Sequence, residues 1–207
     1  MNSIVTIIQI SLAAVLIQNL ILARFLGLCP FLGVSKKLSS ATGMGMAVVF
    51  VMTISSIFTW MIDKFVLIPF DVEYLRTIVF ILVIASLVQL IEMIMHKFTP
   101  ALYDSLGIYL PLITTNCAIL GVVIINTGVN QFTGLPFTFT ESVVNGVASG
   151  AGFLMALVLM AGIRERLELA DIPKTLEGLP IAFICAGLMA LAFLGFSGLS
   201  FFAPVGG

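Results

Sequence analysis

Six long apolar runs cover most of this chain and restrict what it can fold into. They span approximately residues 4–23, 41–62, 75–95, 108–126, 141–163 and 179–203. A helix rises about 1.5 Å per residue, so about 20 apolar residues cross roughly 30 Å of hydrocarbon. With 60% hydrophobic and only 9% charged residues, the chain has too little polar surface for a water-soluble fold. The sequence therefore predicts an all-α membrane protein, with six transmembrane helices in a single integral domain over residues 1–207.

The charges between the runs predict the orientation. The loops after the first, third and fifth runs lie on one side, and the other side carries Lys64 and Arg76. The first side holds seven basic residues: Arg24, Lys36, Lys37, Lys97, Arg164, Arg166 and Lys174. Short basic loops remain in the cytoplasm, so we expect both termini outside and a short cytoplasmic connector at residues 164–178. A net charge of −1 without a basic block argues against a nucleic-acid partner.

An internal repeat places two cysteines at equivalent positions. Residues 29–34 read CPFLGV, and residues 117–122 read CAILGV. Dividing six helices between two copies gives three each, at about residues 1–97 and 98–207. Because three is an odd number of crossings, the second copy is inverted relative to the first. The sequence predicts two inverted three-helix repeats, each carrying its cysteine on a broken helix.

Glycine, proline and short polar residues around both cysteines predict the breaks. The first segment, FLGLCPFLGV, is interrupted by Gly27, Pro30 and Gly33. The second segment, YLPLITTNCAILG, holds Pro111, Thr114, Thr115, Asn116 and Gly121. In inverted-repeat membrane proteins, discontinuous helices of this kind carry the functional centre near the bilayer midplane.

Cys29 and Cys117 are the candidate ligands of a metal centre. A thiolate is a soft metal ligand, whereas a buried thiol without a metal is only a small apolar group, and both readings are open on the residues alone. Two thiolates are half of the four that an iron-sulfur cluster needs, so a second chain has to supply the others. A disulfide between them is disfavoured because assembly from the cytoplasm keeps thiols reduced. Cys185 has no mate, since its repeat-equivalent position is Lys97.

Two roles are possible for each amide inside the apolar runs. The amides are Asn19, Gln89, Asn116 and Asn126, and such groups either bridge helices or line an ion path. Asn116 adjoins Cys117 and is placed to donate a hydrogen bond toward a cluster sulfur. Small residues recur at Gly146, Ala148, Gly150 and Gly152, which predicts close helix packing. No nucleotide-binding or zinc motif is present, so we expect no complete active site in this chain alone.

Four stretches together resemble the family of A subunits of the bacterial Rnf complex, the ion-translocating ferredoxin:NAD oxidoreductase. They are FLGLCPFLGVSKKL (25–38), LGIYLPLITTNCAILGV (106–122), AGIRERLELADIP (161–173) and AGLMALAFLGFSG (186–198). The resemblance runs from the first helix to the last. A paralogous subunit of the sodium-pumping NADH:quinone oxidoreductase is less similar, because a threonine is expected there in place of Pro30.

The resemblance implies a role in electron transport coupled to Na⁺ or H⁺ transport across the bacterial cytoplasmic membrane. It implies pairing with the homologous, oppositely oriented E subunit, in a complex with the B, C, D and G subunits. It also implies a [2Fe-2S] cluster within the membrane, held by Cys29 and Cys117 together with two equivalent cysteines of the partner. On fold grounds alone, inverted repeats fit a small-solute or ion carrier without a redox centre equally well.

Overall fold

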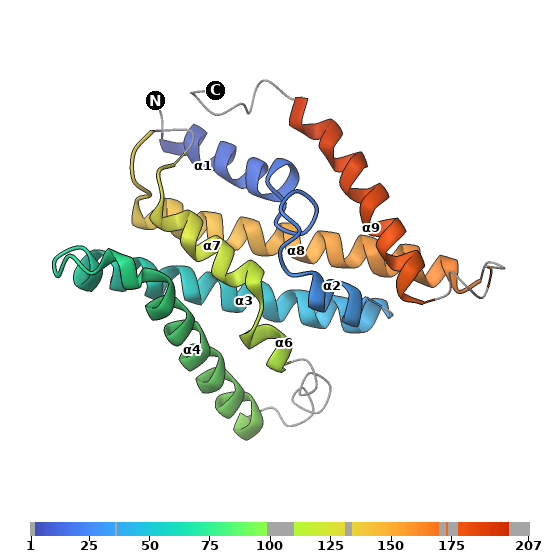
Figure 1. Ribbon diagram of the computed structural model, residues 1–207, viewed down its shortest axis with the longest axis horizontal. Helices are drawn as coiled ribbons and strands as arrows, with labels where there is room; N and C mark the ends of the chain where they lie inside the picture. Colours follow the sequence, from blue (N-terminus) through green and yellow to red (C-terminus); the bar gives the residue numbers. More distant parts are fainter. Residues whose placement is uncertain are drawn as a thin grey trace.

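The computed structural model describes residues 3–35, 37–98, 110–130, 134–169, 173 and 178–198. Across these residues the regular structure is helical, apart from one isolated antiparallel bridge between Val129 and Pro136. Two long helices, α3 and α8, lie across the middle of the molecule, and the other helices pack on them or extend away from them (Figure 1). The prediction of an all-α fold is confirmed for the described residues.

The first helix stops well before the end of its apolar run. Helix α1 (Ser3–Leu12) continues as one π-helical turn, η1 (Ala13–Ile17), and the chain is then irregular. The buried Asn19 Oδ1 accepts a hydrogen bond from the backbone N–H of Ile21 at 3.1 Å, and its Nδ2 donates to the Gly152 carbonyl at 2.8 Å. A side chain that satisfies backbone groups in this way competes with the helix. The prediction of a continuous helix to residue 23 is therefore wrong.

Helix α2 (Leu28–Val34) follows the irregular segment and carries Cys29. Gly27 precedes it as the N-terminal capping residue, with a left-handed φ of 80°. Pro30 lies in the first turn, where a missing backbone N–H costs nothing, and Gly33 lies within the helix. Of the three residues expected to interrupt this segment, only Gly27 does so.

A partly buried ion pair links the next two helices at the corner between them. Helix α3 (Leu38–Ile62) is extended by the π-helical turn η2 (Asp63–Leu67), and a short 3₁₀ turn, η3 (Glu73–Leu75), precedes α4 (Arg76–Phe98). Arg76 Nε donates to Asp63 Oδ1 at 2.9 Å, and Asp63 is buried. The pair holds the start of α4 against the end of α3.

The second broken helix has the form that the sequence predicts. Helix α6 (Leu110–Thr114) and helix α7 (Cys117–Thr127) are separated by Thr115 and Asn116. The break therefore coincides with the short polar residues. Gly121 lies inside α7 and does not interrupt it. Residues 108 and 109 of the predicted fourth run lie outside the described residues.

The last two helices are α8 (Phe139–Leu167) and α9 (Leu179–Leu194), and α9 ends in the 3₁₀ turn η4 (Gly195–Gly198). The N-terminus of α8 is capped by Glu141, whose Oε2 accepts a hydrogen bond from the Thr138 N–H at 2.9 Å. Because α8 continues to Leu167, the predicted connector begins as helix. Residues 170–172, 174–177 and 199–203 lie outside the described residues.

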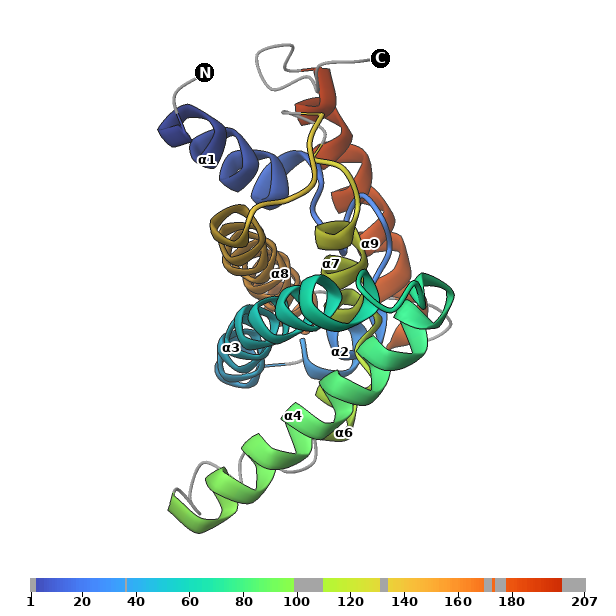
Figure 2. The same cartoon turned by 90° about the vertical axis from the view of Figure 1, so that its left-hand side faces the viewer.

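Close contact between α3 and α8 forms the centre of the molecule (Figures 1 and 2). A Cβ atom added to Gly146 would lie 2.5 Å from Ser56 Oγ, and one added to Gly150 would lie 2.9 Å from the Val49 Cα. Helices can approach this closely only where side chains are very small. The packing role that the sequence predicts for the small residues is confirmed at these two positions.

Each predicted run contains an apolar helix, but only three helices of the described residues have the length and composition to cross a membrane. These are Leu38–Leu67, Arg76–Met93 and Phe139–Leu167. Shorter apolar helices coincide with the other runs at Ile4–Ile17, Leu112–Thr127 and Leu179–Leu194. Large apolar side chains on α4 and α9 point outward, with Leu82 65% and Leu188 61% exposed. Such faces suit a lipid environment.

Candidate metal centre

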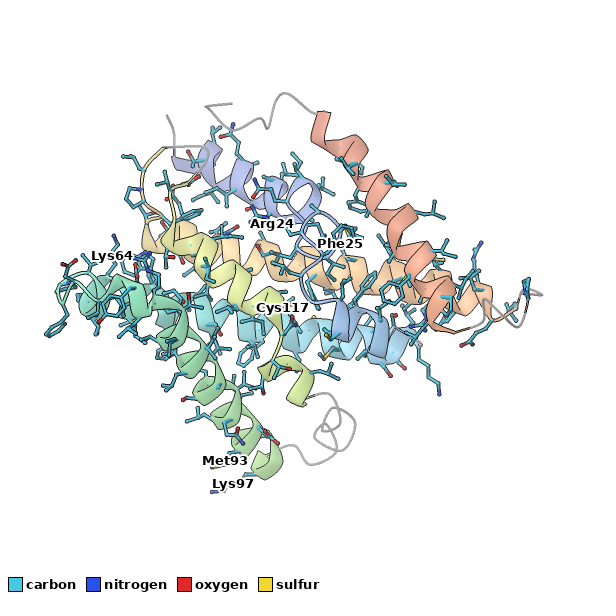
Figure 3. All side chains as sticks on the ribbon, viewed as in Figure 1. Arg24, Phe25, Lys64, Met93, Lys97 and Cys117 are labelled. Carbon is cyan, nitrogen blue, oxygen red and sulfur yellow. The ribbon has the colours of Figure 1, made fainter. Side chains whose placement is uncertain are left out.

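Cys117 is the first residue of α7, and the sequence around it builds that helix start. Asn116 caps the helix with extended backbone geometry, and its Oδ1 accepts a hydrogen bond from the Ala118 N–H at 3.0 Å. Asparagine is among the best residues for this position because its side chain replaces a missing backbone acceptor. The Cys117 thiol is free and exposed. In Figure 3 it lies near the middle of the molecule, whereas Lys64 and Lys97 lie at its extremities.

A hydrogen bond joins the two breaks. The backbone N–H of Gly27, at the start of α2, donates to Cys117 Sγ at 2.9 Å. A Cβ on Gly27 would lie 2.7 Å from Phe153 Cε2 and 3.0 Å from Asn116 Oδ1. With a φ of 80° as well, this position is strained for any residue other than glycine, on both conformational and steric grounds.

Cys29 follows Gly27 by two residues and shares its neighbourhood. Consecutive Cα atoms are 3.80 Å apart, so the Cα atoms of Gly27 and Cys29 are separated by no more than about 7.6 Å. The Cys29 thiol is free and exposed, like that of Cys117. The structure therefore brings the starts of the two cysteine-bearing helices together. The N-terminal end of a helix favours negative charge, which suits thiolates at both positions.

Asn116 has an unused donor beside these thiols. The residue is 5% exposed, and its Nδ2 has no hydrogen-bond partner in the described part of the protein. An amide left unsatisfied in this way costs about 1–3 kcal/mol, so a buried one calls for an explanation.

The donor set fits half of an iron-sulfur cluster. Cys29 and Cys117 provide two exposed soft thiols, which is half of the four ligands that such a cluster takes. Among the described residues, no three His, Cys, Asp or Glu side chains gather into a group that could hold a metal. Cys185 is partly buried and packs against the hydrophobic core. The site thus offers two thiols of this chain as metal ligands.

Arg164 supports the far end of α2, a role that sequence reasoning missed. Its Nη1 donates to the Leu32 carbonyl at 2.7 Å and to Ser35 Oγ at 2.9 Å. A cation at a helix C-terminus satisfies carbonyls that have no partner within the helix. The adjacent Glu165 accepts a hydrogen bond from the Leu38 N–H at 2.9 Å. The end of α8 therefore supports both α2 and the start of α3. The charge pattern of the sequence had indicated only on which side of the membrane Arg164 lies.

Two of the four amides in the apolar runs bridge helices. Asn19 reaches the Gly152 carbonyl on α8, and Asn126 Nδ2 donates to Ser56 Oγ and to the Ser142 carbonyl, each at 3.2 Å. Gln89 is exposed on α4. The bridging role is confirmed for Asn19 and Asn126. Sequence reasoning missed Asn145, whose Nδ2 donates to Asn126 Oδ1 at 2.7 Å.

Comparison with known proteins places the chain in a family. The family model described as "Rnf-Nqr subunit, membrane protein" matches residues 7–200. The A subunit of the Na⁺-translocating ferredoxin:NAD⁺ oxidoreductase complex of Acetobacterium woodii is 55% identical over 194 residues, covering 94% of this chain and 98% of the relative. The A subunit of the proton-translocating ferredoxin:NAD⁺ oxidoreductase complex of Clostridium ljungdahlii is 57% identical over 188 residues, covering 91% and 94%. The A subunit of the ion-translocating oxidoreductase complex of Azoarcus is 53% identical over 193 residues, covering 93% and 97%. This chain belongs to the Rnf-Nqr family of membrane subunits.

Proposed function

We propose that this chain is the A-type membrane subunit of an ion-translocating ferredoxin:NAD⁺ oxidoreductase, and that Cys29 and Cys117 hold half of a [2Fe-2S] cluster. Family membership and the names of its relatives support the first part. The hydrogen bond from the Gly27 N–H to Cys117 Sγ carries the second part, because it brings the two cysteine-bearing helix starts together.

A [2Fe-2S] cluster bound by these residues would supply one-electron transfer. The residues of this chain hold it and set its surroundings. Cys29 and Cys117 provide thiolates, and the Gly27 N–H together with the N-termini of α2 and α7 offsets negative charge on sulfur. Asn116 Nδ2 provides one further donor from a buried position. Hydrogen bonds to cluster sulfurs are among the features that determine a reduction potential.

The exposure of both thiols supports a shared site. A cluster bound by one chain alone would have its ligands facing inward, whereas these two face outward. We propose that the homologous E subunit provides two equivalent cysteines on the opposite side, and that the B, C, D and G subunits complete the assembly. The complex resides in the bacterial cytoplasmic membrane.

The order of elements supports two inverted repeats and six spans. Among the described elements, a broken helix followed by two longer helices occurs twice: α1 to α4, and then α6 to α9. Each break falls just before a cysteine. An odd number of crossings in each copy gives the two breaks opposite directions through the bilayer.

Contacts at the two ends of α3 support the predicted orientation. Arg164 and Glu165 contact the ends of α2 and α3, so the basic end of α8 adjoins Leu38 and Lys37. At the opposite end of α3, Trp60 Nε1 donates to the Phe137 carbonyl at 3.0 Å, near the start of α8. This separation supports a cytoplasmic side at the Arg164 end and termini on the other side.

Metal analysis of the coexpressed pair tests the proposal. We expect about two iron and two acid-labile sulfide per pair after anaerobic purification with the homologous partner, and neither when the two proteins are purified separately. The pair should be coloured and give a [2Fe-2S] paramagnetic resonance signal on reduction. An iron-free pair that is otherwise folded and associated would refute the proposed cluster.

A further inference from the structure

Arg24 lies on the irregular segment between η1 and α2, beside the middle of α8. Asn19 of this segment donates from Nδ2 to the Gly152 carbonyl at 2.8 Å, and the Ala23 N–H donates to the Asn19 carbonyl, also at 2.8 Å. Gly152 is the fourteenth of the 29 residues of α8, a helix that is long and apolar enough to cross a membrane. Figure 3 also shows Arg24 and Cys117 near the middle of the molecule. The sequence predicts Arg24 in a loop outside the apolar runs, whereas the structure places it at mid-depth.

The backbone next to Arg24 is strained. Phe25 has a left-handed φ of 55°, which is unfavourable for a residue with a side chain. The Leu26 N–H donates to the Leu20 carbonyl at 2.8 Å, and this hydrogen bond closes the turn. Strain of this kind persists only where the surrounding structure imposes it, and it is concentrated at functional sites. The turn therefore gives Arg24 a defined place just ahead of Gly27.

The charge of Arg24 has no partner in the described part of the chain. The side chain is exposed, and it forms no hydrogen bond or ion pair with another described residue. A guanidinium stays charged in proteins, and a charge at membrane depth is expensive unless an opposite charge or water compensates it. The position of Arg24 therefore favours an anionic group close by.

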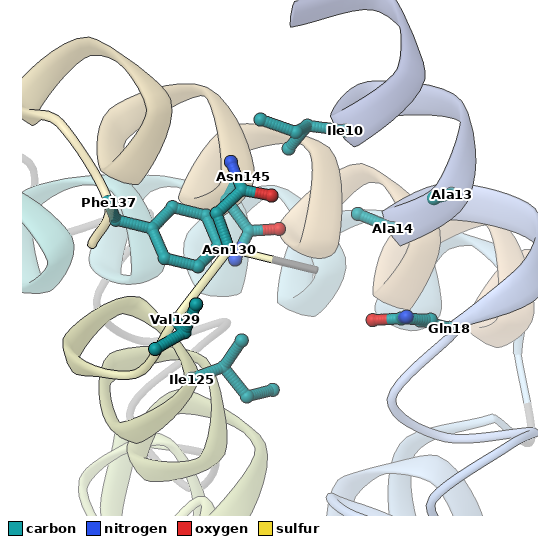
Figure 4. Close-up of a pocket in the computed structure, with 9 residues that line it drawn as sticks. All are labelled: Ile10, Ala13, Ala14, Gln18, Ile125, Val129, Asn130, Phe137 and Asn145. Carbon is teal, nitrogen blue, oxygen red and sulfur yellow. The ribbon is translucent and has the colours of Figure 1, made fainter. Parts of the chain in front are cut away.

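The acidic residues of the described segments lie at other levels. They are Asp63, Asp71 and Glu73 at the corner between α3 and α4, Glu92 beside Met93 on α4, Glu141 at the start of α8, and Glu165 and Glu168 at its end. Figure 3 shows Met93 at an extremity of the molecule. The small cavity shown in Figure 4 provides no charge either, because its polar lining residues, Gln18, Asn130 and Asn145, are neutral amides.

The thiols of Cys29 and Cys117 are the groups at this level that can become negative, because thiols lose their protons when they bind a metal. Gly27, whose N–H donates to Cys117 Sγ at 2.9 Å, follows Arg24 by three residues. The Cα atoms of Arg24 and Gly27 are therefore no more than about 11.4 Å apart. Arg24 is also the basic residue closest to Cys29 along the chain. Like Arg24, both cysteines are exposed.

We propose that Arg24 is the charge partner of the cysteine site, and that its guanidinium stabilises the negative charge that a [2Fe-2S] cluster gains with one electron from the donor of the complex. The inference rests on the proposed cluster. A cation beside an anionic cluster favours the reduced form and so raises the reduction potential. At an effective dielectric constant of about 20, a unit charge roughly 12 Å away shifts such an equilibrium about tenfold, which is about 59 mV for one electron.

Redox titration of the [2Fe-2S] paramagnetic resonance signal in the purified pair tests the inference. Arg24→Gln removes the charge and should make reduction about tenfold less favourable, which lowers the midpoint potential by about 59 mV. Arg24→Lys keeps the charge and should keep the potential near that of the wild type. Arg166→Gln is the matched control, because this exposed arginine lies in the last turn of α8, about 21 Å along the helix axis from Gly152. The control should leave the potential unaltered.

The possible results separate this inference from the proposed cluster. An unchanged potential in Arg24→Gln, or an equal fall in Arg24→Gln and Arg24→Lys, overturns the role of Arg24, and an intact wild-type signal then leaves the cluster standing. Dissociation of the pair in Arg24→Gln, with an unchanged potential in the complex that remains, also overturns it and assigns Arg24 to a carboxylate of the partner subunit. A wild-type pair without the signal refutes the cluster and this inference together.

Arg24→His tests the same point if Arg24→Gln does not assemble. Imidazole titrates between about pH 5 and about pH 8, so the charge at this position would then depend on pH. The midpoint potential of Arg24→His should fall more than that of the wild type between about pH 5.5 and about pH 8.5. The same pH dependence in both proteins would contradict the proposed charge partner.

Discussion

Replacing Gly27 with alanine should damage the cysteine site, and the damage should exceed that caused by the same replacement at Gly33. A left-handed φ costs an ordinary residue about 1–2 kcal/mol. The added methyl group would also lie 2.7 Å from the fully buried Phe153 ring and 3.0 Å from the Asn116 oxygen that caps α7. Overpacking of this kind costs about 1–3 kcal/mol. The total is about 2–5 kcal/mol, concentrated where the Gly27 N–H meets Cys117 Sγ.

Gly33→Ala provides the matched control. Gly33 lies on the same short helix, and a Cβ there meets nothing within 4 Å. This change should be neutral or stabilise α2 by up to about 1 kcal/mol, because alanine is the better helix former. Thermal denaturation of the purified pair, together with the [2Fe-2S] signal per protein, measures both effects. If Gly27→Ala matches Gly33→Ala in stability and cluster content, the proposed joining of the two helix starts is wrong.

Three further changes test the packing and support of the fold. Gly146→Ala places a methyl group 2.5 Å from Ser56 Oγ and should lower the free energy of unfolding by about 1–3 kcal/mol. Gly162→Ala on the same helix is the control, because a Cβ there meets nothing within 4 Å and should not lower stability. Melting curves compare the two variants. Asn126→Leu removes three buried hydrogen bonds and leaves Asn145 Nδ2 without its acceptor. We expect the free energy of unfolding, measured by chemical denaturation, to fall by about 3 kcal/mol or more. A fall below about 1 kcal/mol would contradict the network. Arg164→Ala removes two hydrogen bonds at the end of α2 and should reduce the amount of cluster retained during purification. Arg164→Lys should partly restore it. Equal cluster content in Arg164→Ala and the wild type would show that Arg164 does not support the site.

The helical architecture is predictable from the sequence because hydropathy determines it locally. Every apolar run contains an apolar helix, and two of the five residues named around Cys117, Thr115 and Asn116, lie at the second break. The first break is harder to place, because its cause is the Asn19 side chain binding Gly152, which is 133 residues away. Of the three glycine and proline residues named around Cys29, only Gly27 lies at the break, whereas helix α2 accommodates Pro30 and Gly33. Breaks made by long-range hydrogen bonds have no local signal.

The candidate site, too, is predictable from the sequence only in part. The repeat identifies Cys29 and Cys117 as a pair, because the chemistry of a thiol and its recurrence are properties of the sequence. The contact that joins their helices runs between positions 90 residues apart, and no spacing rule gives it. Arg164 shows the same limit: its charge was counted, but its hydrogen bonds to Leu32 and Ser35 depend on how α8 packs.

Paramagnetic resonance of single-cysteine variants tests the central claim most directly. The purified pair, or the whole complex, is reduced anaerobically after Cys29→Ala, Cys117→Ala or Cys185→Ala substitution. We predict that either of the first two changes removes one [2Fe-2S] signal and the matching iron, and that Cys185→Ala leaves both in place. An undiminished signal in the Cys29→Ala and Cys117→Ala proteins would show that these thiols do not hold the cluster.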